Sequence, residues 1–255
     1  MKTFRLNEME QYIQENGTVT MQTLCDHFQV SLGTIRQDVG ALVQKGTVTK
    51  VYGGVSSARP GGLVPFDERR GRNFRRKQAI GKKAAELLQD RDVLFLDSGT
   101  TTMQLIEHIP PEKRITVLTH NLSAMQAAIP YEHVELISLP GKLDRRTNSF
   151  LAADLRYFEQ YNITIAMMAT TGISPVGDVT NSILLEHEIK RMAVEKSERT
   201  YLMADSGKFE RASLITYAKL DQFTGIVTDS DISPAAAKLV REAGIDLQLA
   251  KLKAD

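Results

Sequence analysis

The sequence predicts a small, mainly helical domain followed by a larger α/β domain with a mostly parallel sheet. A stretch rich in Gly, Pro and Ser, residues 53–65, interrupts the chain early, and this composition is typical of a linker. After it, short apolar runs alternate with helical runs, as in βαβ units whose sheet is covered by helices on both faces. The expected boundaries are 1–55 for the small domain, 56–66 for the linker and 67–255 for the large domain.

The composition is that of an ordinary globular chain. Of its 255 residues, 42% are hydrophobic and 25% are charged, which is enough apolar material for a core. No apolar run reaches the roughly 20 residues of a membrane span, and the start of the chain lacks the apolar core of a signal peptide. The single cysteine, Cys25, excludes an internal disulfide framework and fits a reducing compartment. We therefore expect a cytoplasmic protein without a membrane partner.

The net charge of +1 says nothing about nucleic-acid binding, but the charge is unevenly distributed. Basic residues are concentrated in RRGRNFRRKQAIGKK, residues 69–83, just after the predicted linker. Such a segment is either a solvated helix face beside an acidic domain or a segment that lies close to a polyanion.

Helices with a tight turn are expected in the small domain. Thr20 and Ser31 stand where a second and a third helix would begin, and both residue types are good N-caps. A helix, a tight turn and a second helix form the helix-turn-helix plan, in which the second helix enters the DNA major groove. Apolar residues recur at helical spacing in segments 7–17, 20–28 and 31–46, and a strand-like run follows at 47–54.

The residues expected to contact DNA face outward from the third helix or follow it. Ser and Thr can reach phosphates or bases, Arg and Gln can make bidentate base contacts, and Lys can contact phosphates. A small helical domain with a hairpin can also bind protein, and residues 1–58 carry no net charge, so the pattern alone leaves both readings open. The inward apolar set is Leu24, Val30, Ile35, Val39 and Leu42, and the DNA candidates are Ser31, Thr34, Arg36, Gln37, Lys45 and Lys50.

The large domain is expected to contain strands that alternate with helices. Because ligands of such sheets bind beyond the carboxyl ends of the strands, DSGTTT, THN and DSGKF, which each follow a strand, should lie along one edge. The predicted strands are 92–96, 115–118, 134–139, 163–169, 200–204 and 224–228, and the predicted helices are 101–109, 121–129, 152–160, 184–197 and 233–244.

DSGTTT has the composition of a phosphate-binding loop. Gly99 lets the backbone turn tightly and approach a ligand, while hydroxyls and helix N-terminal N–H groups are phosphate donors. An ordinary Ser/Thr-capped helix is the alternative. The motif is neither a nucleotide P-loop, since no Gly-Lys-Ser/Thr follows, nor a G-x-G-x-x-G loop. The candidate residues are Asp97, Ser98, Gly99, Thr100, Thr101 and Thr102.

Further polar residues follow the other strands. Lys208 is a candidate ligand clamp that Asp205 could orient, Lys142 could meet an anion, and a loop at 169–181 is long enough to overhang the site. A helix cap, a solvated loop or a surface ion pair is the alternative reading of each. The candidates are Thr119, Asn121, Gly141, Lys142, Gly172, Gly177, Thr180, Asp205 and Lys208.

The small domain resembles the helix-turn-helix of the DeoR-type family of bacterial sugar-metabolism regulators. That family runs through F-x-V-S-x-x-T-I-R-x-D and L-x-x-x-G to a closing GG. These features stand here as Phe28, Val30, Ser31, Thr34, Ile35, Arg36, Asp38, Leu42, Gly46, Gly53 and Gly54. The sequence has Gln37 where the family usually has Arg, a departure at one presumed DNA contact.

The large domain resembles the effector domain of the same family. K-x-x-I-x-x-x-A-A (from Lys77), LDSGTTT, T-x-N, G-D-V-T, E-x-x-I-K-R and D-S-x-K-F occur in the family's order, whereas Pro140-Gly141 and Leu151-Ala152 depart from it. The resemblance implies a Rossmann-like fold similar to ribose-5-phosphate isomerase. It also implies a phosphorylated sugar or polyol as effector.

An aldose–ketose isomerase needs a carboxylate that moves a proton between adjacent carbons. Where the related isomerases have an acidic cluster, this sequence reads TTGIS, and the nearest acids are Glu186 and Glu188 on a charge-rich helix expected to be solvated or ion-paired. Glu186 is also a candidate residue of the effector site. The histidines have no metal-ligand spacing, and Cys25 is expected in the core.

The sequence thus predicts a regulator that is not an enzyme and has no catalytic residues, metal or cofactor. It is expected to repress a carbohydrate-utilisation operon as a homo-oligomer, a dimer or tetramer, on double-stranded operator DNA. A sugar-phosphate isomerase with an accessory helix-turn-helix domain is the main alternative, and a non-catalytic protein-interaction module is another.

Overall fold

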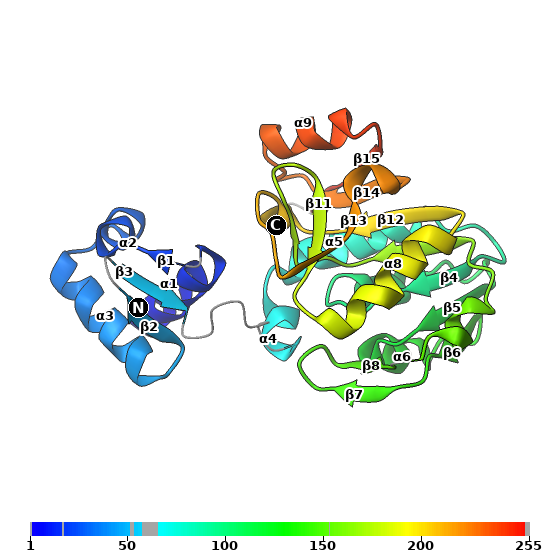
Figure 1. The fold of residues 1–255 in the computed structure, drawn as a ribbon, viewed down its shortest axis with the longest axis horizontal. Coiled ribbons are helices and arrows are strands. Elements are labelled where there is room, and N and C mark those ends of the chain that lie inside the picture. Colours follow the sequence, from blue (N-terminus) through cyan, green and yellow to red (C-terminus); the bar gives the residue numbers. More distant parts are fainter. Residues whose placement is uncertain (1, 17, 52–53, 58–65, 153, 253–255) are drawn as a thin grey trace. The chain divides into compact units, whose positions relative to one another are not determined.

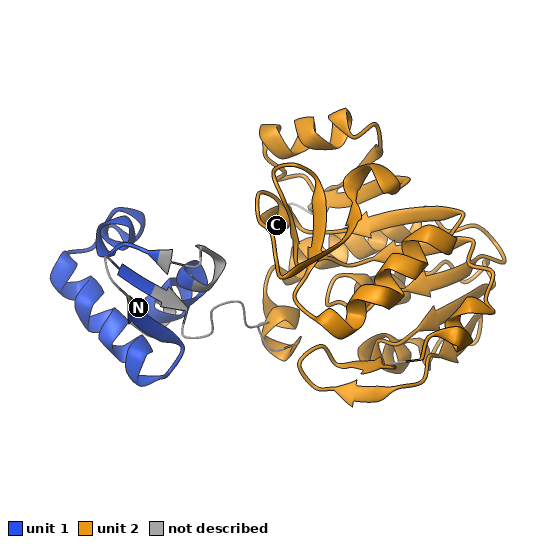
Figure 2. Cartoon of the chain, viewed as in Figure 1, with its two compact units in different colours: residues 1–62 blue, residues 63–255 orange. Residues whose placement is uncertain are grey.

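The computed structural model describes residues 2–16, 18–51, 54–57, 66–152 and 154–252, and the chain forms two compact units, residues 1–62 and 63–255 (Figure 2). The predicted linker, 56–66, spans this division, and its residues 58–65 lie outside the described residues. Ser56 and Ser57, assigned to the linker by composition, are instead part of strand β3 (Gly54–Ser57), and Phe66 begins helix α4 (Phe66–Gly71).

Strand β3 extends into the predicted linker because it pairs on both sides. It is antiparallel to β1 (Thr18–Val19) and to β2 (Val48–Val51). Gly54 lies so close to β1 that an added Cβ would stand 2.2 Å from the carbonyl oxygen of Val19. Glycine here therefore serves a close approach of two backbones rather than a flexible linker.

Unit 1 is a winged helix-turn-helix domain. Its described helices are α1 (Lys2–Asn16), α2 (Met21–Phe28) and α3 (Leu32–Gln44) (Figure 1). Thr20 and Ser31 cap α2 and α3 as predicted, since their hydroxyls accept the N–H groups of Thr23 at 3.0 Å and Thr34 at 3.3 Å. The predicted inward residues are confirmed, with Leu24, Ile35, Val39 and Leu42 buried and Val30 packed against them.

Unit 2 is built around a parallel sheet that has seven strands in the described chain, in the order β15-β14-β12-β9-β4-β5-β6. The predicted Rossmann-like class is confirmed. Strand β15, at one edge, was missed because its side chains are mostly half-exposed. The strands are β4 (Val93–Leu96), β5 (Ile115–Thr119), β6 (Val134–Ser138), β9 (Ile165–Met168), β12 (Arg199–Met203), β14 (Gly225–Asp229) and β15 (Asp246–Ala250).

The strand order places a switch point between β4 and β9. From β4 the chain proceeds to β5 and β6 on one side, and then returns to β9 and continues outward on the other side. In such sheets, the carboxyl ends of the two strands at the switch point are the usual ligand position.

Helices cover both faces of this sheet (Figure 1). Side chains alternate along each strand, so that Leu94 and Leu96 belong to one apolar core and Phe95 to the other. The first core lies against α5 (Phe74–Ala85), η1 (Thr102–His108) and α6 (Leu122–Ala128). The second lies against α7 (Arg156–Glu159), α8 (His187–Lys196) and α9 (Pro234–Glu242).

Short antiparallel strands account for regions predicted as loops. Lys142–Asp144 (β7) pairs with Ser149–Leu151 (β8). The predicted overhanging loop, 169–181, instead contains β10 (Gly172–Ile173) and β11 (Asp178–Asn181), which join β13 (Ile215–Lys219) in a small sheet. Its partner strand is distant in sequence, so the loop pattern gave no sign of it. The remaining short helices are η2 (Leu184–Glu186), η3 (Ser206–Lys208) and η4 (Leu220–Gln222).

The helix predicted after DSGTTT is a 3₁₀ helix, η1, rather than an α-helix. Side-chain donors compete for the carbonyl oxygens of its first turn: the Gly99 carbonyl accepts Thr102 Oγ1 at 3.2 Å and Asn121 Nδ2 at 3.1 Å. The α-type bond from Met103 N–H to the same oxygen is correspondingly long, 3.4 Å. This short helix therefore contributes little dipole to the loop before it.

None of the helices in the described segments has the length and apolar character needed to cross a membrane.

Replacing Gly81 by Ala should destabilise unit 2, because an added Cβ would stand 2.6–2.7 Å from the backbone of Gln104 and push α5 away from η1. We expect a loss of about 1–3 kcal/mol in the free energy of unfolding, measured by urea denaturation. Gly71→Ala, where an added Cβ meets nothing within 4 Å, is the control. Equal midpoints for the two variants would contradict this packing.

Candidate functional site

The candidate site lies where the chain leaves β4, at the switch point. Asp97 is fully buried there. Its carboxylate accepts the N–H groups of Ser98 and Ala169, both at 2.8 Å, and forms an ion pair with Lys190. Because Ala169 follows β9 and Lys190 lies in α8, this one side chain joins the ends of two neighbouring strands to a helix on one face of the sheet.

A second buried carboxylate, Glu186, lies beside the same loop. It accepts the Ser98 hydroxyl at 2.7 Å and the Asn181 amide at 2.9 Å, and it is 4.0 Å from the Lys190 ammonium. Burial alone would raise the pKa of Glu186, but the charge of Lys190 and the two hydrogen bonds lower the pKa below its ordinary value. Asp97 and Glu186 thus share the Lys190 ammonium.

The turn of the loop presents backbone donors. Among the described residues, no acceptor lies within hydrogen-bond distance of the N–H groups of Gly99, Thr100 and Thr101. The hydroxyls of Thr100 and Thr101 have no hydrogen-bond partner within that part of the chain either, and both side chains are about 95% buried. An added Cβ on Gly99 would stand 2.8 Å from Cβ of Ala169, so the turn needs glycine. These donors can bind an anion.

Other predicted residues hold this loop in place. Thr102 Oγ1 donates to the Asp97 carbonyl at 2.8 Å. Thr119 Oγ1 donates to the Leu96 carbonyl at 2.6 Å, and Asn121 Nδ2 donates to the Gly99 carbonyl at 3.1 Å while its Oδ1 caps α6. Their side chains are therefore occupied within the protein, and they position the loop.

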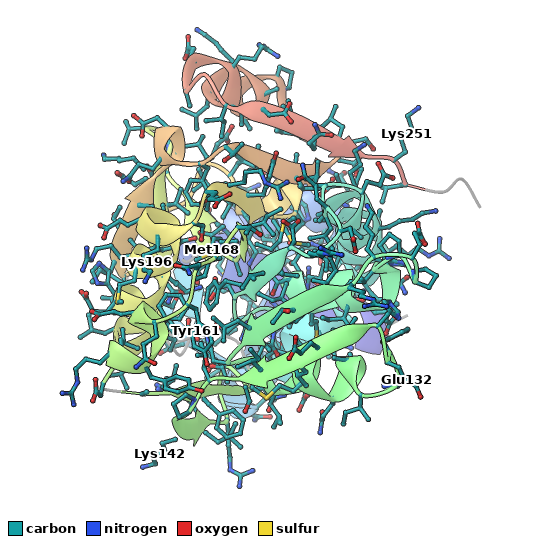
Figure 3. The ribbon with its side chains drawn as sticks, turned by 90° about the vertical axis from the view of Figure 1, so that its right-hand side faces the viewer. Glu132, Lys142, Tyr161, Met168, Lys196 and Lys251 are labelled. Atoms are coloured by element: carbon teal, nitrogen blue, oxygen red, sulfur yellow. The ribbon has the colours of Figure 1, made fainter. Side chains whose placement is uncertain are left out.

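Residues predicted on the later hairpins lie elsewhere. Lys142 is exposed on β7 and stands at the periphery, whereas Met168 of β9 lies inside (Figure 3). The Thr180 hydroxyl donates to the Gly172 carbonyl and accepts the Ser213 N–H, both at 2.8 Å. Gly177, with φ +84°, forms the β10–β11 turn, and Gly141 packs against the Leu151 backbone at the base of β7. In the described chain these contacts engage Thr180 and the two glycines in the structure of the hairpins.

Pro140, Leu151 and Ala152, the departures from the family pattern, line a shallow apolar pocket that opens to solvent. Leu185 and Ile189 line it as well. Ser149 of β8, next to the pocket-lining Phe150, donates its hydroxyl to Glu186 at 3.3 Å.

Asp205 and Lys208 follow β12, beyond β9 along the same edge. The Asp205 carboxylate caps η3 by accepting the Gly207 N–H at 3.2 Å, and it also accepts the Asn73 amide at 3.3 Å. Asp205 thus connects the start of α5 to the end of β12. Lys208 is half-buried in η3.

The predicted DNA-contacting residues lie on one helix and its surroundings. Arg36 and Gln37 are exposed on α3, and Lys50 is exposed on β2. Ser31 and Thr34 share a hydrogen bond of 3.0 Å at the start of α3. Lys45 is exposed but forms a 2.7 Å ion pair with Glu10 of α1.

Two family models match the chain: a DeoR-like helix-turn-helix domain at residues 5–60 and a DeoR C-terminal sensor domain at residues 72–230. The chain belongs to the DeoR family. It is a DNA-binding transcriptional regulator with a sensor domain.

Relatives of this DeoR-family chain are similar over nearly its whole length. It is 39% identical to the HTH-type transcriptional regulator IolR of Bacillus subtilis over 98% of this chain and 100% of that protein. It is 24% identical to the glycerol-3-phosphate regulon repressor of Escherichia coli over 97% of this chain and 99% of that protein. Among solved structures, ribose 5-phosphate isomerase A from Neisseria gonorrhoeae matches 52% of each chain, with a TM-score of 0.39 and 15% identity.

The DeoR-family site contains residues that the sequence did not single out. Lys190 is 1% exposed, and it donates to the Ala169 carbonyl at 3.2 Å as well as to Asp97. Tyr217 also donates to that carbonyl, at 2.8 Å, and burial raises its pKa well above the ordinary value. The charge-rich helix that the sequence predicts to be solvated or ion-paired therefore has one exposed side and one buried side. Glu188 is exposed and paired with Arg191, whereas Glu186 and Lys190 are buried.

His120 is fully buried beside Asp97. Its Nε2 lies 3.8 Å from Asp97 Oδ1, and within the described chain neither ring nitrogen has a hydrogen-bond partner. Burial lowers the pKa of His120, helped by the charge of Lys190 and opposed by the charges of Asp97 and Glu186. Among the described residues, no group of three or more His, Cys, Asp or Glu side chains could hold a metal ion.

Lys77 of α5 is a buried cation at the same edge of the sheet. It is 4% exposed, and its ammonium donates to the Arg69 carbonyl. Burial lowers the pKa of Lys77 to about 8; the charge of Asp205 opposes this shift and the charges of Lys208, Arg69 and Arg72 add to it.

Removing Lys190 should leave two buried carboxylates without their shared counter-charge. For Lys190→Met we expect the free energy of unfolding to fall by about 3–5 kcal/mol, measured by chemical denaturation. Lys196→Met, at the exposed end of the same helix, should change it by less than about 0.5 kcal/mol. A Lys190→Met chain as stable as the control would show that this ion pair does not stabilise the fold.

Because of Lys77, the free energy of unfolding should depend on pH in the alkaline range. Its pKa is about 8 when folded against an ordinary 10.5, so between these values the unfolded chain binds more protons and the folded state gains stability as pH rises. Relative to Lys77→Met, the wild-type free energy of unfolding should rise by up to ~3 kcal/mol between about pH 8 and pH 10.5. Urea denaturation across this range measures the difference. The exposed Lys82→Met should follow the wild type, and a pH-independent difference for Lys77→Met would contradict the shift.

Proposed function

We propose that this DeoR-family regulator represses a carbohydrate-utilisation operon and that a phosphorylated sugar or polyol bound to unit 2 controls its hold on operator DNA. The main support is the loop at the switch point, where the N–H groups of Gly99, Thr100 and Thr101 have no acceptor in the described chain and two threonine hydroxyls stand beside them. Backbone N–H groups in a turn, together with hydroxyls, are suited to a phosphate.

The remaining part of the site suits a hydroxylated carbon skeleton. Ionised Glu186 can accept hydrogen bonds from sugar hydroxyls, and Ser98 lies between it and the N–H groups of the loop. The relative from E. coli is named for glycerol 3-phosphate, a phosphorylated polyol, which is in keeping with this effector class.

In unit 1, α3 would enter the major groove. Arg36 and Gln37 can make bidentate base contacts, and Ser31, Thr34, Lys45 and Lys50 can contact phosphates. A homo-oligomer, a dimer or tetramer, would match paired operator half-sites. Effector binding would favour a state whose paired units no longer fit those half-sites, and a coupling free energy of about 1–3 kcal/mol changes affinity roughly 5- to 150-fold.

We further propose that unit 2 does not catalyse isomerisation. Both buried carboxylates are engaged, Asp97 by Lys190 and two N–H groups and Glu186 by Ser98 and Asn181, which disfavours a proton-shuttling role for either. Sugar-phosphate turnover that disappears in Glu186→Gln would favour the isomerase instead.

Variants in the two units should separate DNA binding from effector response. Arg36→Ala should weaken operator binding about 10- to 100-fold, as loss of a bidentate base contact does, and leave effector binding intact. Thr101→Val should leave operator binding intact and weaken the effector response about 10- to 100-fold, because a hydrogen bond to a charged group is lost. Fluorescence anisotropy with operator duplex, with and without sugar phosphates, measures both.

Gln44→Ala, exposed at the far end of α3, is the matched control for Arg36→Ala. Loss of both functions in either variant would mean that the residue supports folding rather than recognition.

A further inference from the structure

We propose that Arg69 of α4 completes the anion site, so that a bound phosphate holds α4 against the loop at residues 98–101. This inference rests on the proposed phosphorylated effector and adds a ligand-contacting residue outside the sequence-predicted set. Helix α4 is the first described element after residues 58–65, which connect the two units in sequence. An anion that holds α4 would therefore act on the segment that leads to the DNA-binding unit.

The packing of α5 brings the α4–α5 segment to the edge where the loop lies. Asn73 donates to Asp205 at 3.3 Å, and Arg76 donates to Ser206 at 3.2 Å, and both partners follow the carboxyl end of β12. One face of α5 then contacts η1 so closely at Gly81 that only glycine fits against Gln104. Both helices run away from this edge. Lys77 lies one turn before Gly81 in α5 and is therefore level with the loop that precedes η1.

Arg69 lies between this segment and the buried carboxylate. Its carbonyl accepts the Lys77 ammonium, and its guanidinium donates to the carbonyl of Arg146 in the β7–β8 turn at 3.3 Å. Burial lowers the pKa of Arg69, and the charge of Glu186 opposes that shift. The guanidinium is thus within electrostatic reach of Glu186, whose other contacts include Ser98 of the loop.

The charges on this side of the loop favour an anion. Beside the burial of Lys77, the nearby charges of Lys208, Arg69 and Arg72 lower its pKa, and Asp205 is the acid that opposes them. Asp205 already accepts hydrogen bonds from Asn73 and Gly207. A phosphate between these cations and the loop donors would relieve the repulsion, and a guanidinium can bind it in bidentate fashion.

The hydroxyls of Thr100 and Thr101 are the second half of this arrangement. The two residues are only 5% and 6% exposed, and their hydroxyls have no hydrogen-bond partner in the described chain, yet neither oxygen is sealed from solvent, so both remain open to a ligand acceptor. Arg69 lies in α4, a helix of six residues that is anchored by the buried Phe66 and by the bond from Lys77 to the Arg69 carbonyl. Ligand binding can change how firmly α4 is held without changing the sheet.

The test uses inorganic phosphate and the full-length chain, with chloride at matched ionic strength as the reference. Phosphate should raise the melting temperature of the wild type and slow amide hydrogen exchange in residues 66–71. Arg69→Met should bind phosphate at least tenfold more weakly and lose the slowed exchange. Arg70→Met, its exposed neighbour, should behave as the wild type, and Arg69→Lys should retain part of the affinity.

The outcomes distinguish this inference from the proposed function. Phosphate binding that is lost in Thr101→Val but unchanged in Arg69→Met, with exchange of residues 66–71 still slowed, would overturn the role of Arg69 and keep the loop as the site. A wild type indifferent to phosphate would overturn the phosphate site itself, and both proposals with it. If Arg69→Met melts well below the wild type without phosphate, Arg69→Lys decides: partial phosphate affinity supports the contact, and wild-type affinity with wild-type exchange overturns the bidentate role of the guanidinium.

Discussion

The buried carboxylate of Asp97 is the interaction on which the site depends. A charge in the interior is costly unless it is paired and hydrogen-bonded, and here Lys190 and the N–H groups of Ser98 and Ala169 supply those partners. These partners come from the loop after β4, the end of β9 and α8, so the carboxylate fixes three segments at once. Of the N–H groups of the turn, Asp97 accepts only the first, that of Ser98, so the N–H groups of Gly99, Thr100 and Thr101 remain available to a ligand.

Much of the backbone architecture could be predicted because it follows from local pattern. Buried parallel strands such as β4 and β9 appear as uninterrupted apolar runs, and Thr20 and Ser31 mark helix starts whatever surrounds them. Features that depend on distant partners escaped prediction. Half-exposed β15 has no such run, and β10 and β11 exist because β13 pairs with them from far along the chain.

The site was predictable in position but less so in the duties of its side chains. A strand followed by DSGTTT located the loop, yet Asp97, Thr102 and Asn121 support the loop rather than face a ligand. Lys190 was missed since α8 carries the same residue types on both sides, and only tertiary packing decides that Glu188 and Arg191 are exposed while Lys190 is buried. Residue type and spacing do not reveal which side of a charged helix meets the sheet.

The strand order also sets the sequence in which the site can be assembled during synthesis. The loop after β4 emerges from the ribosome together with β5 and β6, but Ala169 follows roughly seventy residues later and Lys190 later still. Until α8 has been synthesised, the Asp97 carboxylate has no ammonium with which to pair. Until β9 has been synthesised, only one of the two loops at the switch point exists. A partly synthesised chain can therefore carry a complete helix-turn-helix while the site of unit 2 is still unable to form.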